Sequence, residues 1–377
     1  MASYDLSAAF DCIDATILDK KLEHYGIDTC CRKWIESFLM NRRQFVRVGA
    51  ARSSCVQLTA GSPQGSILSP LLFLIYLADI NEWLSVGSAF SYADDTAAIT
   101  FGETKEIAIQ KLEKTSNEML QYFASNMLVA NATKTTVLVF RTPRSKDSFG
   151  HMVNIGGALV MESKSIKLLG INISPDMSWT NQYDSLISSL RSSNGLLSRL
   201  SKFAPNKYLT PLIHGLQLSK VRYALPLFCD VRIDDSDVMT SGMRQVQVEL
   251  NKGLRIILGT SISDRIPIQE LVDKVGVPSA NQLAVEATLM EMWRHLNYCL
   301  PAMDNLVLLD NHQVGERETR RTGKGFLAPP PQDESGAARF LQQGSRLWNL
   351  APQELRDERI ESRAKRIIRD FASNMPL

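Results

Sequence analysis

Two adjacent carboxylates, Asp94 and Asp95, lie in the segment Phe90-Ser-Tyr-Ala-Asp-Asp-Thr-Ala-Ala-Ile99, between two short apolar runs. Apolar flanks of this length around a polar centre predict a β-hairpin whose strands are buried and whose turn carries the acids. Two carboxylates side by side in a half-buried turn are costly unless a cation neutralises them. Mg²⁺ suits this role, because it binds one or two carboxylates together with substrate phosphates. A turn with two solvated aspartates is the alternative for the pair alone.

Two other segments strengthen the metal interpretation. Tyr4-Asp-Leu-Ser-Ala-Ala-Phe-Asp-Cys-Ile-Asp14 puts a third carboxylate, Asp5, in a short strand, and Ala60-Gly-Ser-Pro-Gln-Gly-Ser-Ile-Leu-Ser-Pro-Leu-Leu-Phe-Leu-Ile-Tyr76 predicts a loop followed by a buried helix. Two divalent ions about 4 Å apart can activate an attacking 3′-hydroxyl and hold the leaving oxygen in nucleotidyl transfer. Such a pair needs carboxylates from two strands. Asp5 together with the Asp94–Asp95 pair supplies them.

In order and spacing, the three segments resemble the palm of reverse transcriptases, most closely those of non-LTR (LINE-type, Jockey/I-like) retrotransposons. The resemblance is dense from Ala2 to about Trp179 and thinner toward the C-terminus. It implies an RNA-directed DNA polymerase that joins dNTPs to a DNA primer on an RNA template, using two Mg²⁺ ions, or Mn²⁺ in their place. It also implies that Asp5 and Asp94 are the principal metal ligands and that Asp95 is the third acid.

The same resemblance assigns neighbouring residues to the substrates. Phe10 would stack under the sugar and leave no room for a 2′-hydroxyl, which favours dNTPs over rNTPs. Gln64 would contact the incoming nucleotide and template, and Gly65 would permit close backbone approach. The remaining assignments are the primer end for Tyr92, the incoming sugar for Ala93 and the leaving pyrophosphate for Lys134. A core phenylalanine, a loop glutamine and a solvated turn lysine are the plainer alternatives.

A stretch that contains basic but no acidic residues follows the palm-like region. From Ser185 to Cys229 the sequence contains no Asp or Glu, although several Lys and Arg residues fall inside. A surface that follows a phosphate backbone needs such a block, and a solvated basic helix face is the alternative. The nucleic-acid-binding candidates are Arg191, Arg199, Lys202 and Lys207.

The length and composition of the chain limit its possible domain number, cellular compartment and membrane association. At 377 residues, with 44% hydrophobic and 22% charged residues, the chain is long enough for two or three domains and a substantial core. The six cysteines show no metal-binding spacing, which suggests reduced thiols in an intracellular compartment, nucleus or cytoplasm. The sequence shows neither a signal peptide nor an apolar run that could span a bilayer, so we expect no membrane partner.

These patterns predict an α+β fold, in which a polymerase palm (an antiparallel sheet packed on helices, ferredoxin-like) precedes a helical thumb-like region. The expected domains are a palm at 1–175, a helical thumb or connection region at 176–314, a linker at 315–337 and a short helical segment at 338–377. In the palm, helices are expected at 14–26, 28–40, 69–83 and 103–127, and a hairpin at 45–58. Asp11 and Asp14 are assigned capping roles.

One departure from the family affects the functional prediction. Reverse transcriptases normally carry a fingers region before the first aspartate, and here Asp5 stands almost at the start of the chain. We therefore expect a palm and thumb portion without the fingers, truncated and weakly active or inactive alone. The rival hypothesis is a non-catalytic nucleic-acid-binding remnant of a retrotransposon polyprotein. A viral-type RNA polymerase is disfavoured by Phe10, and by Ala93 where a glycine is usual.

Overall fold

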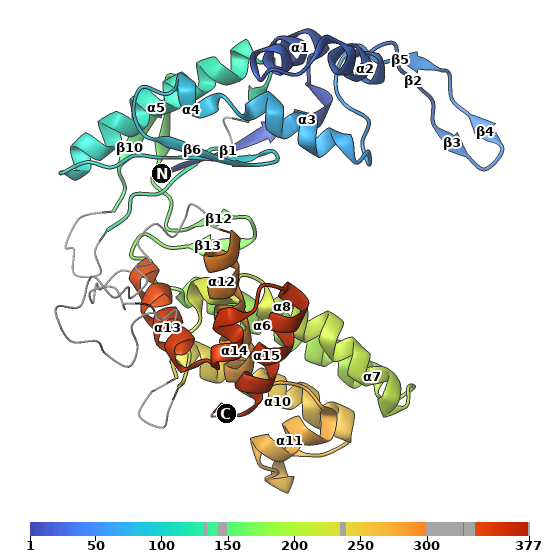
Figure 1. Cartoon of the computed structure of the whole chain (residues 1–377), viewed down its shortest axis with the longest axis vertical. Helices are drawn as coiled ribbons and strands as arrows, with labels where there is room; N and C mark the ends of the chain where they lie inside the picture. Colours follow the sequence, from blue (N-terminus) through green and yellow to red (C-terminus); the bar gives the residue numbers. More distant parts are fainter. Residues whose placement is uncertain (132–133, 142–148, 234–238, 299–326, 328–335, 376–377) are drawn as a thin grey trace. The chain divides into compact units, whose positions relative to one another are not determined.

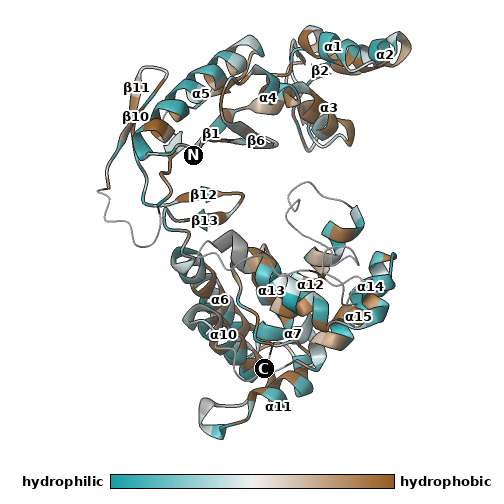
Figure 2. Cartoon of the chain, turned by 60° about the vertical axis from the view of Figure 1, so that its left-hand side comes forward, coloured by the Kyte–Doolittle hydropathy of each residue, from teal (hydrophilic) through white to brown (hydrophobic). Residues whose placement is uncertain are grey.

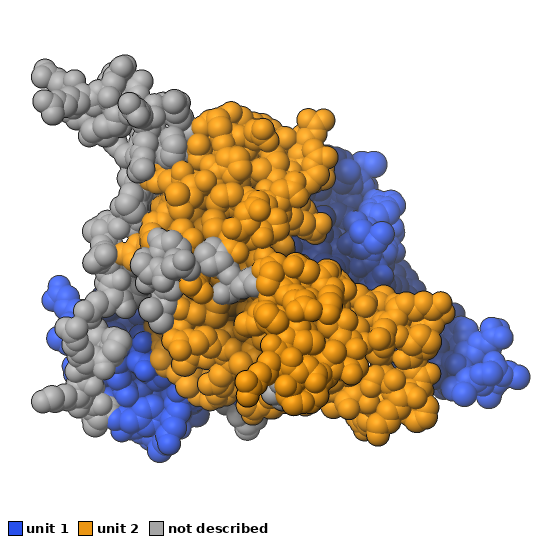
Figure 3. Space-filling view, turned by 90° about the horizontal axis from the view of Figure 1, so that it is seen from below, with its two compact units in different colours: residues 1–176 blue, residues 177–377 orange. Residues whose placement is uncertain are grey.

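The computed structural model describes residues 1–131, 134–141, 149–233, 239–298, 327 and 336–375 (Figure 1). The chain divides into two compact units, Met1–Asp176 and Met177–Leu377, which are coloured separately in Figure 3. The first unit packs an antiparallel sheet on helices and the second is helical, so the predicted α+β fold class is confirmed. The four-part division into palm, thumb, linker and C-terminal segment stays a prediction, and most of the 315–337 linker lies outside the described residues.

The described part of the first unit is organised around a five-stranded antiparallel sheet in the order β6-β7-β1-β8, in which β9 also pairs with β1. Its strands are β1 (Ala2–Ser7), β6 (Ser88–Tyr92), β7 (Asp95–Ile99), β8 (Val129–Ala130) and β9 (Thr136–Val137). Strand β1 is therefore central, with β7 along one side and β8 and β9 along the other.

Five helices accompany this sheet in the described residues: α1 (Ala15–His24), α2 (Thr29–Leu39), α3 (Leu68–Leu77), α4 (Ile80–Trp83) and α5 (Lys105–Ser125). The carboxylate of Asp14 accepts hydrogen bonds from the amides of Thr16 and Ile17 at the start of α1, as the capping prediction required. Asp11 does not cap, because it lies in a short 3₁₀ turn, Ala9–Asp11, and contacts Gln64 instead. The helix predicted at 69–83 is two helices, α3 and α4, and α3 is apolar along its length (Figure 2).

Alternation along β1 decides which side chains face the core. Tyr4 and Leu6 are buried, whereas Asp5 between them is not. The Tyr4 ring packs edge-on against Phe123 of α5 with centroids 6.0 Å apart, and its hydroxyl donates to the Ser116 Oγ at 2.6 Å. The packing that holds Tyr4 inward therefore turns Asp5 to the opposite face of the sheet.

The predicted acid-bearing hairpin is β6–β7, but only β7 is mainly buried. Phe90 and Tyr92 of β6 are 60% and 70% exposed. The reason is that β6 is the edge strand of the sheet, so its outward-facing side chains have no neighbouring strand or helix to cover them. The prediction that both strands are buried was wrong for β6.

Four short strands between α2 and α3 form an extended ribbon, in which β2 (Arg43–Gln44) pairs with β5 (Val56–Gln57) and β3 (Arg47–Val48) with β4 (Ala51–Arg52). This ribbon is the hairpin predicted at 45–58. Two further pairs follow the sheet: β10 (Met152–Ile155) with β11 (Ala158–Met161), and β12 (Ile166–Leu168) with β13 (Ile171–Ile173).

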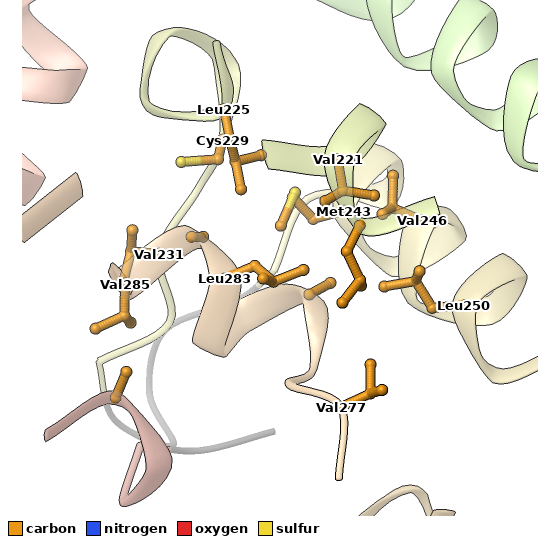
Figure 4. Close-up of a cluster of buried hydrophobic side chains, with 14 of the residues drawn as sticks. Val221, Leu225, Cys229, Val231, Met243, Val246, Leu250, Val277, Leu283 and Val285 are labelled. Carbon is orange, nitrogen blue, oxygen red and sulfur yellow. The ribbon is translucent and has the colours of Figure 1, made fainter. Parts of the chain in front are cut away.

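The second unit has a core of its own, part of which is drawn in Figure 4. The long helices α6 (Thr180–Leu200), α10 (Ser241–Leu258) and α12 (Ala280–Tyr298) supply nearly half of the buried residues of this core, and Trp293 of α12 is fully buried in it. The other elements are α7 (Asn206–Ile213), a π-helical turn η2 (His214–Leu218), α8 (Ser219–Arg222), α9 (Leu225–Phe228), a 3₁₀ turn η3 (Ile262–Asp264), α11 (Ile268–Val275), α13 (Gly336–Leu350), α14 (Gln353–Asp357) and α15 (Glu361–Ser373). Within the described ranges, no helix is long and apolar enough to cross a membrane.

Candidate active site

The three predicted acids come together on one face of the sheet, at the end where β6 turns into β7. Asp5 of β1 and Asp95 of β7 are directly opposite partners in the antiparallel register, and Asp94 precedes Asp95 in the two-residue connection from β6. Opposite residues of antiparallel strands point to the same face, with Cβ atoms about 5 Å apart. Because Thr96, the next residue of β7, is fully buried, Asp95 turns away from the core as Asp5 does.

The three carboxylates repel one another, and the structure relieves this repulsion only in part. Partial burial, together with the charges of Asp94 and Asp5, raises the pKa of the Asp95 carboxyl. The Lys134 Nζ lies 2.9 Å from the Asp5 Oδ2 and forms an ion pair with it, with both side chains substantially exposed to solvent. The family resemblance assigned Lys134 to a leaving pyrophosphate, with a solvated turn lysine as the alternative, and here its ammonium group lies beside Asp5.

The acids do not form a closed ligand sphere. In the described part of the chain, no group of three or more His, Cys, Asp or Glu side chains is arranged so that it could hold a metal ion. The donor set itself suits a hard divalent cation, since it consists of carboxylates that repel one another at neighbouring positions. Asp94 and Asp95 are exposed and Asp5 is half-buried, so solvent has access to the side chains that would have to converge.

The hairpin turn constrains the backbone beside the acids. Only Ala93 and Asp94 connect β6 to β7, and Ala93 has a φ of +53°, in the left-handed region that favours glycine. A non-glycine residue in this region costs about 1 kcal/mol or more. Tight pairing of Tyr92 with Asp95 holds the residue there, and the turn in this way fixes Asp94 at the tip.

The Gln64 loop is attached directly to the segment that follows β1. The amides of Gly61 and Ser62 donate to the carbonyls of Ile13 and Phe10 at 2.8 and 2.9 Å, and the Gln64 Nε2 donates to the Asp11 Oδ1 at 3.2 Å. A Cβ on Gly61, whose φ is +83°, would lie 2.7 Å from the Asp11 Cα, so only glycine permits this approach.

A half-buried arginine supports the same loop. The Arg42 guanidinium donates to the carbonyls of Leu39, Ala60 and Gly61, at 2.8, 3.1 and 2.6 Å. These bonds join the end of α2 to the loop that presents Gln64. Gly65 has a φ of +81° and open space around its Cα, as a close-approach position requires.

Phe10 is half-buried and packs against Phe73 of α3, with ring centroids 4.7 Å apart. The position of α3 is fixed by the largely buried ammonium group of Lys21. The Lys21 Nζ donates to the Asp79 Oδ1 and to the Tyr76 carbonyl, both at 2.7 Å, and Asp79 also accepts from the Tyr122 hydroxyl. This network joins α1, α3 and α5, and thereby fixes the helix on which Phe10 rests.

The basic block of the second unit separates into two environments. Arg191 of α6 forms an ion pair with Glu249 of α10, whose carboxyl also binds Lys252. Burial of Glu249 opposes its ionisation, but hydrogen bonds from Lys252 and Arg191 outweigh this and lower its pKa. The other candidates, Arg199, Lys202 and Lys207, are exposed around the α6–α7 turn.

With this geometry established, comparison with known proteins identifies the first unit. Residues 1–173 match the family described as "Reverse transcriptase (RNA-dependent DNA polymerase)". This match spans almost the whole of the first unit, which is therefore similar to a reverse transcriptase domain. Its predicted resemblance to the enzymes of non-LTR retrotransposons is confirmed by relatives that come from mobile elements.

Three such relatives match part of the chain. The RNA-directed DNA polymerases from mobile element jockey of Drosophila melanogaster and Drosophila funebris are 26% identical over 183 residues and 30% over 164 residues. These matches cover 47% and 42% of this chain, and 19% and 18% of the relatives. The probable RNA-directed DNA polymerase from transposon BS of D. melanogaster is 27% identical over 186 residues, covering 45% of this chain and 19% of the relative. The chain thus spans less than a fifth of the length of the curated relatives that it matches.

Among solved structures, a telomerase from Candida albicans in complex with the TWJ fragment of telomeric RNA aligns with a TM-score of 0.41 and 13% sequence identity. The alignment covers 81% of this chain and 49% of the telomerase chain.

Several supporting residues of the first unit were not recognised from the sequence. Arg42 was given no role, and Asp11 was assigned to a cap rather than to a contact with Gln64. Their partners are 19 and 53 residues distant in sequence, so no local pattern reveals them. The one local signal was Gly61, a glycine before a Ser-Pro pair, which marks a sharp loop but not its contact with Asp11.

Proposed function

We propose that the chain is the RNA-directed DNA polymerase region of a non-LTR retrotransposon protein, which transfers nucleotides from dNTPs to a DNA primer on an RNA template. The observation that supports this most directly is the register of the acids. Asp5 and Asp95 are cross-strand partners, and Asp94 is held beside them by the tight β6–β7 turn. The strand pairing thus brings Asp5 together with the Asp94–Asp95 pair, from distant positions in the sequence.

The acids would hold divalent cations, with Asp5 and Asp94 as the principal ligands and Asp95 as the third. Two bound ions, Mg²⁺ by preference of these hard oxygen donors, would stabilise the charge that develops on the attacking and leaving oxygens. The carboxylates supply the negative potential that attracts them, and the pKa of Asp95 is raised by its partial burial and, to a smaller extent, by the charges of Asp94 and Asp5. Lys134 neutralises Asp5 on this face, from where its ammonium would neutralise the leaving pyrophosphate.

The remaining substrate contacts follow from the walls of the site. Phe10 is backed by Phe73, so its ring cannot retreat from a ribose that carries a 2′-hydroxyl. This supports selection of dNTPs over rNTPs. Gln64 is exposed on a loop fixed by Arg42, which would orient its amide toward template and nucleotide. Tyr92, also exposed, would contact the primer end, and the small Ala93 side chain would leave space for the incoming sugar.

A non-catalytic nucleic-acid-binding protein is the second candidate. The observation in its favour is that Lys134 already pairs with Asp5, while the acids of the described chain do not converge as ligands. In this case the acids would bind no divalent cation, and only the basic surfaces would act.

Mn²⁺ titration of the whole chain, followed by primer extension on an RNA template, tests the proposal. Asp94→Asn should weaken Mn²⁺ binding at this site about tenfold and reduce extension about a hundredfold, because positioning of the reacting groups is lost. Asp184→Asn is the matched control, since Asp184 is an exposed acid on α6. Equal Mn²⁺ affinity for the unaltered chain and Asp94→Asn would reject the metal site and favour the non-catalytic candidate.

A further inference from the structure

The ribbon of β2 to β5, residues 43–57, is a charged feature of the first unit that the proposed active site does not use; we call it the arginine ribbon. Figure 1 shows it projecting from the end of α2. Every residue from 43 to 57 is exposed. Two-stranded ribbons without a core on either face are marginally stable in water, so this surface is suited to gain order from a partner.

The charge of the arginine ribbon indicates the chemistry of that partner. Between Glu36 and Asp79 the sequence has no acidic residue. The exposed arginines of the ribbon are Arg43, Arg47 and Arg52, and none of them takes part in an ion pair of the described chain. A stretch with one sign of charge and no counter-charge is complementary to a polyanion.

The register of the ribbon strengthens this inference. Arg47 and Arg52 are directly opposite partners on β3 and β4. Like charges at opposite positions destabilise a strand pair, because their Cβ atoms lie only about 5 Å apart. A phosphate between the two guanidinium groups would convert this repulsion into two charge-assisted hydrogen bonds.

Apolar groups lie among these cations. Phe45 is 48% exposed, and the Arg52 guanidinium lies 5.2 Å from the centroid of its ring. Val46 and Val48 are 67% and 74% exposed. Exposed aromatic and guanidinium planes beside phosphate-binding groups are the combination that binds unpaired nucleotides, since every base presents a flat face for stacking.

The ribbon is also fixed to the Gln64 loop. The Leu58 amide at its base donates to the Arg42 carbonyl, and the Arg42 side chain binds the Gly61 carbonyl. We propose that the arginine ribbon binds the unpaired template strand as it approaches the Gln64 loop. This inference rests on the proposed function, because it assumes that a template is present at that loop.

The test measures binding of the whole chain to two labelled ligands over a range of salt concentrations: a primer–template with a long unpaired 5′ template overhang, and a blunt duplex of the same paired length. The variant combines Arg43→Gln, Arg47→Gln and Arg52→Gln. Because these residues are fully at the surface, its melting temperature should match that of the unaltered chain. For the overhang ligand, the slope of log affinity against log salt should fall by about 2, at about 0.7 per lost phosphate contact on a single strand.

The matched control combines Lys105→Gln, Lys111→Gln and Lys114→Gln on α5, which removes the same charge from a helix where acidic residues alternate with lysines. Its slope should be unchanged, as should the slope of the ribbon variant on the blunt duplex. An unchanged slope on the overhang ligand would overturn the inference, and so would equal losses on both ligands. Since binding is measured without dNTPs or divalent cations, this result is independent of whether Asp94→Asn affects catalysis.

Discussion

At the scale of single residues, the chain keeps an unfavourable charge arrangement at its candidate site. Asp95 lies beside Asp94 and opposite Asp5, and these charges, with partial burial, raise the pKa of its carboxyl. Lys134 compensates only at the surface, where ion pairs contribute about 1 kcal/mol or less. A carboxyl with a raised pKa in a cluster of like charges is a candidate functional group, which is why the metal proposal is centred on these three acids.

This repulsion gives a pH prediction with a definite sign. The folded-state pKa of Asp95 is raised above its unfolded value, so ionisation favours the unfolded chain. Without divalent cations, the contribution of Asp95 to stability should therefore fall as the pH rises from the unfolded pKa through the raised one. Asp95→Asn should increase the melting temperature of the first unit at pH 7 but not at pH 3.

Calorimetry at both pH values, with and without Mn²⁺, checks the prediction. Mn²⁺ should raise the melting temperature of the unaltered chain at pH 7 by more than that of Asp95→Asn. Glu113→Gln on α5 is a suitable control, because its carboxylate accepts a hydrogen bond from the Asn154 amide, outside the acid cluster. A melting temperature of Asp95→Asn equal to that of the unaltered chain at pH 7 would show that the three charges do not interact.

At the scale of elements, the α6–α7 turn combines cations with exposed rings. Phe203 is 87% exposed, and the Lys207 Nζ lies 4.9 Å from the centroid of the exposed Tyr208 ring. Arg199 and Lys202 complete this surface, whereas Arg191 is committed to the pair with Glu249 two turns earlier on α6. The basic block identified from composition thus contains residues with different roles.

Substitution should separate these roles. Replacing Arg199, Lys202 and Lys207 with Gln should lower the salt-dependence slope of duplex binding by about 2 to 3 and leave the melting temperature unchanged. Arg191→Gln should leave the slope unchanged and lower the melting temperature, because it leaves the buried Glu249 carboxylate with one cation fewer. Salt titration and thermal melting of both variants decide the matter. Loss of binding with Arg191→Gln, without loss of stability, would return Arg191 to the nucleic-acid surface.

The elements themselves were predictable where the determining signal is local. Aspartate caps at Asp14 and Asp28 begin α1 and α2, and period-2 alternation places Asp5 on the open face of β1. The break between α3 and α4 was not predictable, since Asp79 at that point is bound by Lys21, 58 residues earlier in the chain. The exposure of β6 was missed for a related reason: edge position depends on strand order, which no segment encodes by itself.

The contacts of the candidate site could also be predicted only in part from the sequence. The family resemblance predicted that the three acids lie close enough to share a metal ion. The strand register brings Asp5 opposite Asp95, but in the described residues the acids are not arranged so that they could hold a metal ion. The resemblance could not predict that Lys134 pairs with Asp5 across 129 positions, or that Gln64 rests on Asp11 across 53. Both contacts are polar and exposed, and so leave no hydrophobic pattern in the sequence.

At the scale of the whole molecule, the two units carry different kinds of candidate site, and the boundary between them lies at Asp176. The first unit carries the acids, the Gln64 loop and the arginine ribbon, while the second carries the α6–α7 surface. The core of the second unit draws its members from α6 through α15, including fully buried Leu190, Trp293 and Leu347. Tyr183 and Trp179, near its beginning, contact Phe228 of the same unit.

The core of the second unit consists of residues from that unit, so we predict that the unit folds independently. Residues 177–377, produced as a separate polypeptide, should unfold in one cooperative transition, with a melting temperature within a few degrees of the corresponding transition in the full chain. The polypeptide should bind duplex nucleic acid with the salt dependence that the α6–α7 surface gives, and Arg199→Gln, Lys202→Gln and Lys207→Gln together should abolish that dependence. Mn²⁺ should not shift its melting temperature, because all three acids of the candidate site lie in the first unit. A gradual, non-cooperative transition would mean that the helices of the second unit need the first unit to complete their packing.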